Sequence, residues 1–171
     1  MKMNFVISLA LLLIAISSYA QDSTQLKRTP YKLIVQVDKK NVYEEDINAT
    51  PYVMPNKAVQ IYPGETIFLE IEQVNGKILS VTAVPEIKNP SKTVTLSFTQ
   101  TAKKKVHELM MLKVVNPFSY TLVYKAVMSV LPQKKWVETD VYPVMPGLSG
   151  FETWPYVITS LGLGDWELKA K

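Results

Sequence analysis

His107 is the single histidine of this chain, so any catalytic arrangement that needs an imidazole must be built around it. Glu108 follows it, but no Gly-x-Ser-x-Gly motif occurs that would present a serine nucleophile. Met110 and Met111 add thioethers, which are soft ligands suited to copper(I). Adjacent residues of a strand point to opposite faces, however, and methionine is a common core residue. We therefore predict neither a catalytic triad nor a metal site at His107.

Paired carboxylates are the remaining route to catalysis. Glu138 and Asp140 stand two residues apart, so on a strand they would share one face, as a glycosidase pair does. Glu152 and the acidic trio 44–46 are further candidates. Acidic residues on solvated edges and loops are far commoner than catalytic pairs, and the chain has no glycine-rich phosphate loop and no EF-hand calcium loop. The sequence therefore predicts a protein that is not an enzyme, with no catalytic residues and no cofactor.

The composition argues against several other function classes. The chain has no cysteine, so disulfides, thiolate metal sites and thiol redox chemistry are excluded. Its 19 basic and 15 acidic residues give a formal net charge of only +4. The lysine run 103–105 is typical of a solvated turn, whereas nucleic-acid binding needs a basic stripe interleaved with aromatic residues. We expect no nucleic-acid partner.

Residues 1–20 have the three parts of a secretory signal peptide. Lys2 supplies the positive charge, the apolar run extends from Phe5 to Ile16, and the small residues Ser18 and Ala20 precede a polar stretch. A membrane span needs about 20 apolar residues, and this run and every later apolar run are shorter. We expect cleavage after Ala20, export to the periplasm or the exterior, and no membrane span in the mature protein.

The rest of the chain divides into a flexible polar leader, residues 21–30, and one domain over residues 31–171. Apolar and polar residues alternate with a period of two in much of this domain, and turn signals such as Asn75-Gly76 separate the alternating segments. The stretch 39–55 looks like a long connection, and 107–114 is ambiguous between strand and helix. The main expected strands are 31–38, 66–73, 78–84, 93–99, 106–115 and 120–130. This pattern predicts an all-β, immunoglobulin-like antiparallel sandwich of about seven to nine strands, with a small closed barrel as the alternative.

Two segments resemble a known class of proteins. The run from Leu112 to Tyr124 contains a strand, an Asn116-Pro117 turn and a return strand, and residues 62–65 read Tyr-Pro-Gly-Glu. These segments resemble exported bacterial proteins with immunoglobulin-like domains, including the amino-terminal domains of periplasmic pilus chaperones. The resemblance implies a fold rather than an activity, because such sandwiches host many functions. The pilus chaperones have two such domains, and this chain has room for one.

The segment 136–156 is the candidate binding region, because it is rich in proline, glycine and aromatic residues. Flat aromatic faces stack on sugars or anchor protein partners, and long ordered loops are often functional. The candidate partner- or ligand-binding residues are Trp136, Tyr142, Phe151, Trp154 and Tyr156. The structural alternative is that these side chains cap the open end of the sandwich.

We expect the protein to act through protein–protein contacts in the cell envelope, as an accessory subunit or an assembly factor with an envelope or secreted partner. An unpaired sheet edge would be the docking element, since strand addition uses main-chain hydrogen bonds. The alternative is a carbohydrate- or small-ligand-binding module that uses the segment 136–156. Exposed tryptophans would favour this alternative, and buried ones would count against it.

Overall fold

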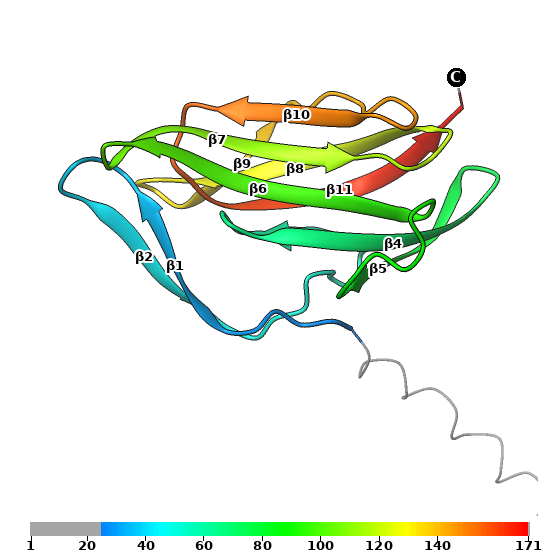
Figure 1. Cartoon of the computed structure of the whole chain (residues 1–171), viewed down its shortest axis with the longest axis horizontal. Helices are drawn as coiled ribbons and strands as arrows, with labels where there is room; N and C mark the ends of the chain where they lie inside the picture. The colour runs from blue at the N-terminus through cyan, green and yellow to red at the C-terminus, as the bar shows by residue number, and fades with distance from the viewer. Residues whose placement is uncertain (1–24, 171) are drawn as a thin grey trace, which may run out of the picture.

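The computed structural model describes residues 25–170, and its regular structure is antiparallel β-sheet (Figure 1). The predicted signal peptide, residues 1–20, lies outside the described residues. Within the described range there is no helix long and apolar enough to cross a membrane. The all-β class predicted from the alternation is confirmed.

Eleven strands between residues 25 and 170 form three sheets. A five-stranded sheet has the order β10-β7-β6-β4-β5, a four-stranded sheet has the order β3-β11-β8-β9, and β1 and β2 form a separate hairpin. The strands are β1 (Tyr31–Gln36), β2 (Val42–Ile47), β3 (Val59–Ile61), β4 (Thr66–Val74), β5 (Lys77–Val84), β6 (Thr93–Lys103), β7 (Val106–Val115), β8 (Thr121–Val130), β9 (Lys135–Thr139), β10 (Ser149–Trp154) and β11 (Ile158–Lys169).

The two larger sheets pack together because their strands turn alternate apolar side chains inward. Ile67, Leu69 and Ile71 of β4 are buried in the same core as Leu161 and Leu163 of β11. The side chains at the intervening positions lie on the outer faces of the sheets. These two sheets hold nine strands, the upper limit of the predicted number, and the hairpin supplies the other two.

One segment differs from the expectation, and a second segment, which was ambiguous between strand and helix, is a strand. Residues 42–47, expected within a long connection, form β2 and pair with β1 over six positions. Their sequence, VYEEDI, did not indicate a strand because it is mostly charged and only Ile47 is buried. Residues 107–114 belong to β7, and alternate side chains from Met110 to Val114 point into the core.

The β1–β2 hairpin stands at the side of the stacked sheets, with its turn close to the β6–β7 turn (Figure 1). Its inner face carries Leu33, Val35 and Ile47, which are buried in a second, smaller apolar cluster. Tyr62 and Val157 of the main body pack against that cluster. The hairpin therefore has its own contact with the body, separate from the core between the sheets.

The end of β1 is tied to β6 by a side-chain amide. Gln100 accepts a hydrogen bond from the backbone N–H of Gln36 at 2.9 Å and donates one to the Gln36 carbonyl at 2.8 Å. The same amide nitrogen donates to Nδ1 of His107 at 2.9 Å, so the His107 proton resides on Nε2 and is donated to the Pro155 carbonyl at 3.2 Å. His107 thus has a structural role between the hairpin and the end of β10.

Arg28 anchors the segment that precedes the β1–β2 hairpin in the sequence. The sequence assigns it to a flexible leader, yet its side chain is 2% exposed. Its Nε donates to Oε1 of Glu65 at 2.9 Å, its Nη1 to Oγ1 of Thr50 at 2.7 Å, and its Nη2 to the Gln60 carbonyl at 2.8 Å. Contacts with the body therefore begin before Tyr31, the expected start of the fold.

Aromatic rings enclose this ion pair. The guanidinium carbon of Arg28 lies 4.5 Å from the ring centroid of Tyr52 and 5.1 Å from that of Tyr62. The second carboxylate oxygen of Glu65 accepts the backbone N–H of Tyr62 at 2.9 Å. Tyr31 lies nearby, and burial together with the Glu65 carboxylate raises the pKa of its hydroxyl.

Replacing Arg28 tests how strongly this pair holds the fold. Arg28→Ala should lower the free energy of unfolding by about 3–5 kcal/mol, because it leaves the Glu65 carboxylate buried without its partner. Urea denaturation followed by tryptophan fluorescence measures the change. The double variant Arg28→Met/Glu65→Leu removes both charges, so its free energy of unfolding should be closer to that of the parent chain. Equal losses in the single and double variants would contradict the assignment of the effect to the unpaired charge.

Candidate functional site

β9 and β10 are neighbouring edges of the two sheets. Within residues 25–170, β9 pairs only with β8 and β10 only with β7. Residues 140–148 cross from one strand to the other, and the indole N–H of Trp154 donates to Oγ1 of Thr139 at 2.9 Å. The predicted loop 136–156 is therefore two edge strands joined by a crossover.

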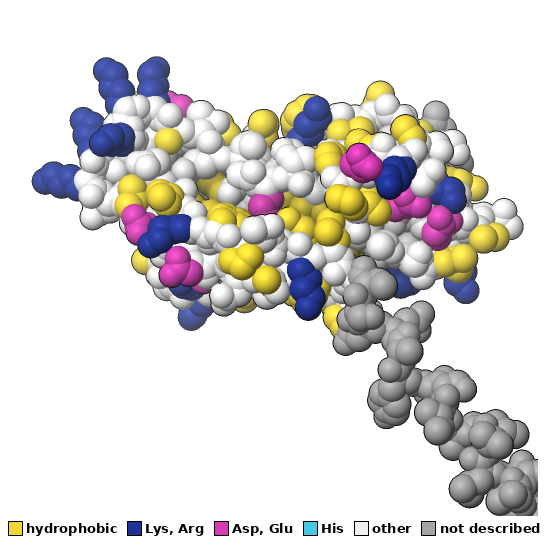
Figure 2. Space-filling model, turned by 60° about the horizontal axis from the view of Figure 1, so that its bottom comes forward, with side chains coloured by type: hydrophobic (Ala, Val, Ile, Leu, Met, Phe, Trp, Pro, Cys, Tyr) yellow, Lys and Arg dark blue, Asp and Glu magenta, His cyan; other side chains and the backbone are white. Residues whose placement is uncertain are grey.

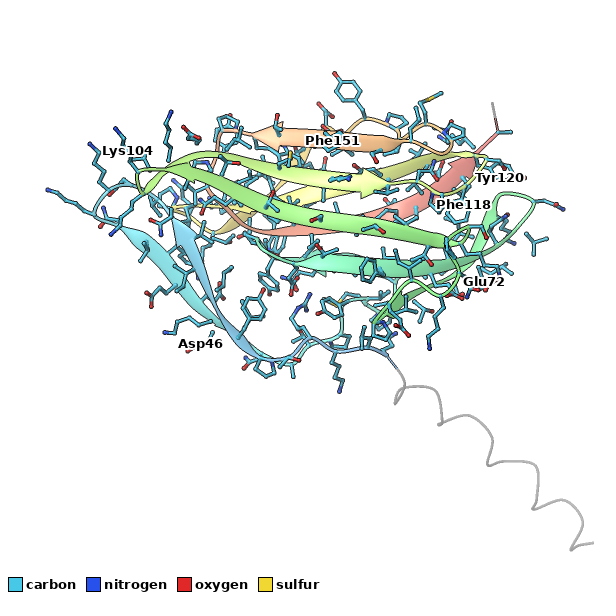
Figure 3. All side chains as sticks on the ribbon, in the orientation of Figure 1. Asp46, Glu72, Lys104, Phe118, Tyr120 and Phe151 are labelled. Atoms are coloured by element: carbon cyan, nitrogen blue, oxygen red, sulfur yellow. The ribbon has the colours of Figure 1, made fainter. Side chains whose placement is uncertain are left out.

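Asn116, which follows β7, holds this crossover in place. Its side chain is 1% exposed, and its amide nitrogen donates to the carbonyls of Tyr120, Val144 and Met145 at 2.8, 2.9 and 3.2 Å. Its side-chain oxygen accepts the N–H of Phe118 at 3.0 Å. Phe118 and Tyr120 lie at the end of the molecule opposite Lys104 (Figure 3). The Asn-Pro turn read from the sequence is thus also the support of the crossover.

Four of the five candidate aromatic residues are exposed and one is buried. The exposed fractions are 51% for Trp136, 80% for Tyr142, 57% for Phe151 and 53% for Tyr156. Trp154 is 7% exposed, and its ring packs edge-on against Phe98 in the core with 6.5 Å between the ring centroids. This burial counts against Trp154 as a contact residue, because its position on β10 turns it inward, whereas Phe151 is turned outward.

The exposed aromatic residues do not form one platform. Phe151 lies on the outer face of the five-stranded sheet, where the ammonium group of Lys113 is 5.8 Å from its ring centroid (Figure 3). Trp136 lies on the outer face of the four-stranded sheet, where a Cβ built on Gly162 would be 3.6 Å from its ring. The segment 136–156 therefore contributes to two separate surfaces.

An open trough of about 610 Å³ lies beside Trp136 on the four-stranded sheet. Gly162 and Gly164 of β11 lie on its floor, because the core residues Leu161 and Leu163 point to the opposite face. The missing side chains at these two positions create the depth of the trough.

Charged side chains line the trough. Nζ of Lys125 is 3.0 Å from Oδ2 of Asp165, and Glu138 and Asp140 also line the trough. The hydrogen bond that Lys125 donates to Asp165 and the negative charge of Asp165, with a smaller effect of Glu138, raise the pKa of Lys125. The pair Glu138 and Asp140, predicted to share one face, lines one cavity, although β9 ends at Thr139. Lys125 offers a hydrogen-bond donor to a polar ligand, and Glu138, Asp140 and Asp165 offer carboxylate acceptors.

Acidic and histidine side chains are the usual metal ligands in a chain without cysteine. No group of three or more such side chains in the described part of the chain is placed to hold a metal ion. Glu152 accepts the backbone N–H of Tyr142 at 2.7 Å, which gives that carboxylate a structural contact.

Comparison with known proteins adds no assignment. No family model, curated protein or solved structure matches this chain. The function is therefore inferred from the geometry of β9, β10 and the trough.

Sequence reasoning missed Lys125 and Asp165, which reach the trough from β8 and β11. Their proximity depends on strand register: Lys125 pairs with Gly164, and a β-bulge follows this pair, between Gly164 and Glu167. The available signal was Gly162-Leu163-Gly164, because glycine at alternate positions of a strand removes the side chains from one face.

Asn116→Ala should loosen the crossover and lower the free energy of unfolding by about 1–3 kcal/mol, since three carbonyls and one N–H lose their partner. Hydrogen exchange with mass spectrometry should show faster exchange over residues 144–148. Asn116→Asp keeps the acceptor for Phe118 but places a carboxylate against three carbonyl oxygens, so it should destabilise at least as much. Unchanged exchange over 144–148 in both variants would contradict the role of Asn116.

Proposed function

We propose that this protein is an exported, non-enzymatic protein of the cell envelope that binds a protein partner by strand addition at the open edge of β10. The observation that carries the proposal is the set of backbone groups on this edge. Two stacked antiparallel sheets support an immunoglobulin-like sandwich, and the amino-terminal sequence pattern supports export.

The direction of the β10 backbone groups follows from one hydrogen bond. The N–H of Asn116 donates to the carbonyl of Leu148 at 2.9 Å, and hydrogen-bonded positions alternate along an antiparallel pair. The even-numbered residues of β10 therefore bond to β7. Its odd-numbered residues, Ser149, Phe151 and Thr153, direct their N–H and C=O groups to the free edge. An added strand would bond to these three residues.

β10 has fewer protective features than the edge strands β2, β3, β5 and β9. Natural edge strands are commonly protected by charges, proline, bulges or a covering segment. β9 begins with Lys135, β2 carries the acidic run 44–46, and β5 begins with Lys77 and has a bulge in its pairing with β4. β3 is covered, because Gln60 donates its N–H to the Tyr52 carbonyl. The sequence of β10, SGFETW, has neither lysine nor proline, and its pairing is uninterrupted.

The side chains around β10 indicate the chemistry of the partner. Phe151 is exposed on the outer face next to the free edge, and Met145 and Leu148 of the crossover are 48% and 58% exposed. Exposed apolar side chains on and beside a strand with open backbone groups favour an extended segment with apolar residues at alternate positions.

A second candidate function is carbohydrate binding in the trough. Trp136 is half exposed beside a glycine floor, and Glu138, Asp140 and Asp165 provide acceptors for sugar hydroxyls. Trp154 and Trp166 are buried, however, so Trp136 is the one tryptophan of the described chain that a sugar ring can reach. This function ranks second because it depends on a single aromatic contact.

Thr153→Pro tests strand addition directly. It removes an N–H that points to the free edge and costs no ladder bond, so stability should change by less than about 1 kcal/mol while partner binding falls at least ~10-fold. Binding is measured by crosslinking from a photoreactive residue at position 149 in native envelope extract, with mapping of the partner peptide. Thr153→Ala is the matched control and should bind normally. Partner capture that survives in folded Thr153→Pro would exclude this edge.

Trp136→Ala tests the carbohydrate function. It should weaken binding of an oligosaccharide found by glycan-array screening about 10-fold, through loss of ring stacking. Gly164→Leu should fill the trough and have a similar effect, since the nearest atom to a Cβ at this position is the Ala58 Cβ at 3.6 Å. Isothermal titration calorimetry measures both. Absence of glycan binding by the parent chain would eliminate this candidate.

A further inference from the structure

Two turns that are far apart in the sequence meet at one end of the molecule and bring five lysines together. Lys39 and Lys40 belong to the β1–β2 turn, Lys104 and Lys105 to the β6–β7 turn, and Lys103 is the last residue of β6. Both turns lie at the left end of Figure 1, Lys104 is labelled there in Figure 3, and Figure 2 shows a group of basic side chains at this end. We call these five residues the basic tip.

The contacts described for Gln100 hold the two turns side by side. Gln100 lies three residues before Lys103 in the sequence. It forms two hydrogen bonds with the backbone of Gln36, which lies three residues before Lys39. The alignment of the two turns is therefore fixed by the fold rather than by the lysines, which repel one another.

The lysines of the basic tip are free of ion pairs. None of the five takes part in a salt bridge between described residues, whereas Lys92, Lys125 and Lys134 do. All five side chains are exposed.

Two acidic residues lie near the basic tip in the chain. Asp38 accepts hydrogen bonds from the side-chain amide of Asn41 and from the backbone N–H groups of Lys40 and Asn41, which lower its pKa. Glu108 is exposed on β7. The balance of five positive charges and two negative charges leaves a concentrated positive field at this end.

The backbone of the β6–β7 turn supports a functional role for the lysines. Lys104 and Lys105 have φ angles of 49° and 67°, in the left-handed region that L-residues with a Cβ disfavour. The same geometry occurs at Asn75 and Gly76, with φ angles of 50° and 81°, and there the sequence has the favoured Asn-Gly pair. The β6–β7 turn thus holds two lysines where Asn-Gly would fit with less strain, as is common at binding sites.

We propose that the basic tip binds the surface of a membrane rich in anionic phospholipids. This inference is independent of the β10 edge and of the trough. A compact tip at the end of the long axis of the molecule can place all its lysines on a flat surface. Nucleic acid would instead require a basic stripe with interleaved aromatic residues, and neither turn contains an aromatic residue. Each lysine near an anionic membrane raises partitioning about five-fold.

The substitution Lys104→Asn/Lys105→Gly separates binding from folding. It removes two charges and gives the turn its favoured residues, so the chain should fold at least as well as the parent. Its partitioning onto vesicles should fall about 25-fold, the product of two five-fold effects. The matched control is Lys57→Asn/Lys77→Gln, which removes two exposed lysines elsewhere, one of them also at a positive φ of 64°. The control should partition within about two-fold of the parent chain.

The measurement is vesicle co-sedimentation of the chain recovered from an exporting host. Vesicles of phosphatidylcholine with about 30 mol % phosphatidylglycerol should bind the parent chain, pure phosphatidylcholine vesicles should not, and about 0.5 M salt should release it. Inorganic phosphate at equal ionic strength should not compete. Equal losses of vesicle binding in the tip and control variants, or vesicle binding that does not require phosphatidylglycerol, would overturn the proposal. Tip-dependent binding to a DNA duplex without binding to vesicles would overturn it as well.

Discussion

The buried ion pair between Arg28 and Glu65 fixes the point at which the chain enters the β1–β2 hairpin, and the Gln100 contacts then fix the turn of that hairpin. It joins the segment before β1 to the start of β4, at a site where both charges are removed from water. Burying two charges is costly, and here the side chain of Thr50, the carbonyl of Gln60 and two tyrosine rings compensate for it. Such a pair specifies one position for the hairpin more than it adds stability. The basic tip exists only because the hairpin turn is held in that position.

The three candidate surfaces occupy different parts of the molecule. The open edge of β10 is one edge of the five-stranded sheet, the trough is on the outer face of the four-stranded sheet, and the basic tip is at one end of the long axis. Different elements support them: Asn116 fixes the crossover next to β10, the two glycines of β11 form the trough floor, and Gln100 aligns the two lysine turns. A protein attached to a membrane by its tip would still have β10 free to accept a strand.

The alternating segments were predictable because a strand with one face in the core has to repeat with a period of two. Thr66–Val74 and Thr93–Lys103 show this pattern, and both are central strands of the five-stranded sheet. β2 was not predictable, because only one of its residues, Ile47, is buried in the hairpin that it forms with β1. Among the candidate aromatic residues, the sequence could not separate Trp154 from Phe151, since their opposite directions follow from the start and pairing of β10. The role of Arg28 was hidden for a similar reason: a polar residue in a polar stretch gives no sign of burial until the residues it contacts, up to Glu65, are known.

The last strand of the chain is a central strand of the four-stranded sheet. β11 lies between β3 and β8, and Gln60 of β3 hydrogen-bonds to Ser160, which is 100 residues away in the sequence. Among the described strands of its sheet, β3 pairs only with β11, so that sheet cannot form completely until β11 is present. Such non-local pairing makes folding slow and leaves apolar surface and strand edges open to aggregation in the meantime. A nascent chain with this topology has to be protected from misassociation until β11 has emerged and paired with β3 and β8.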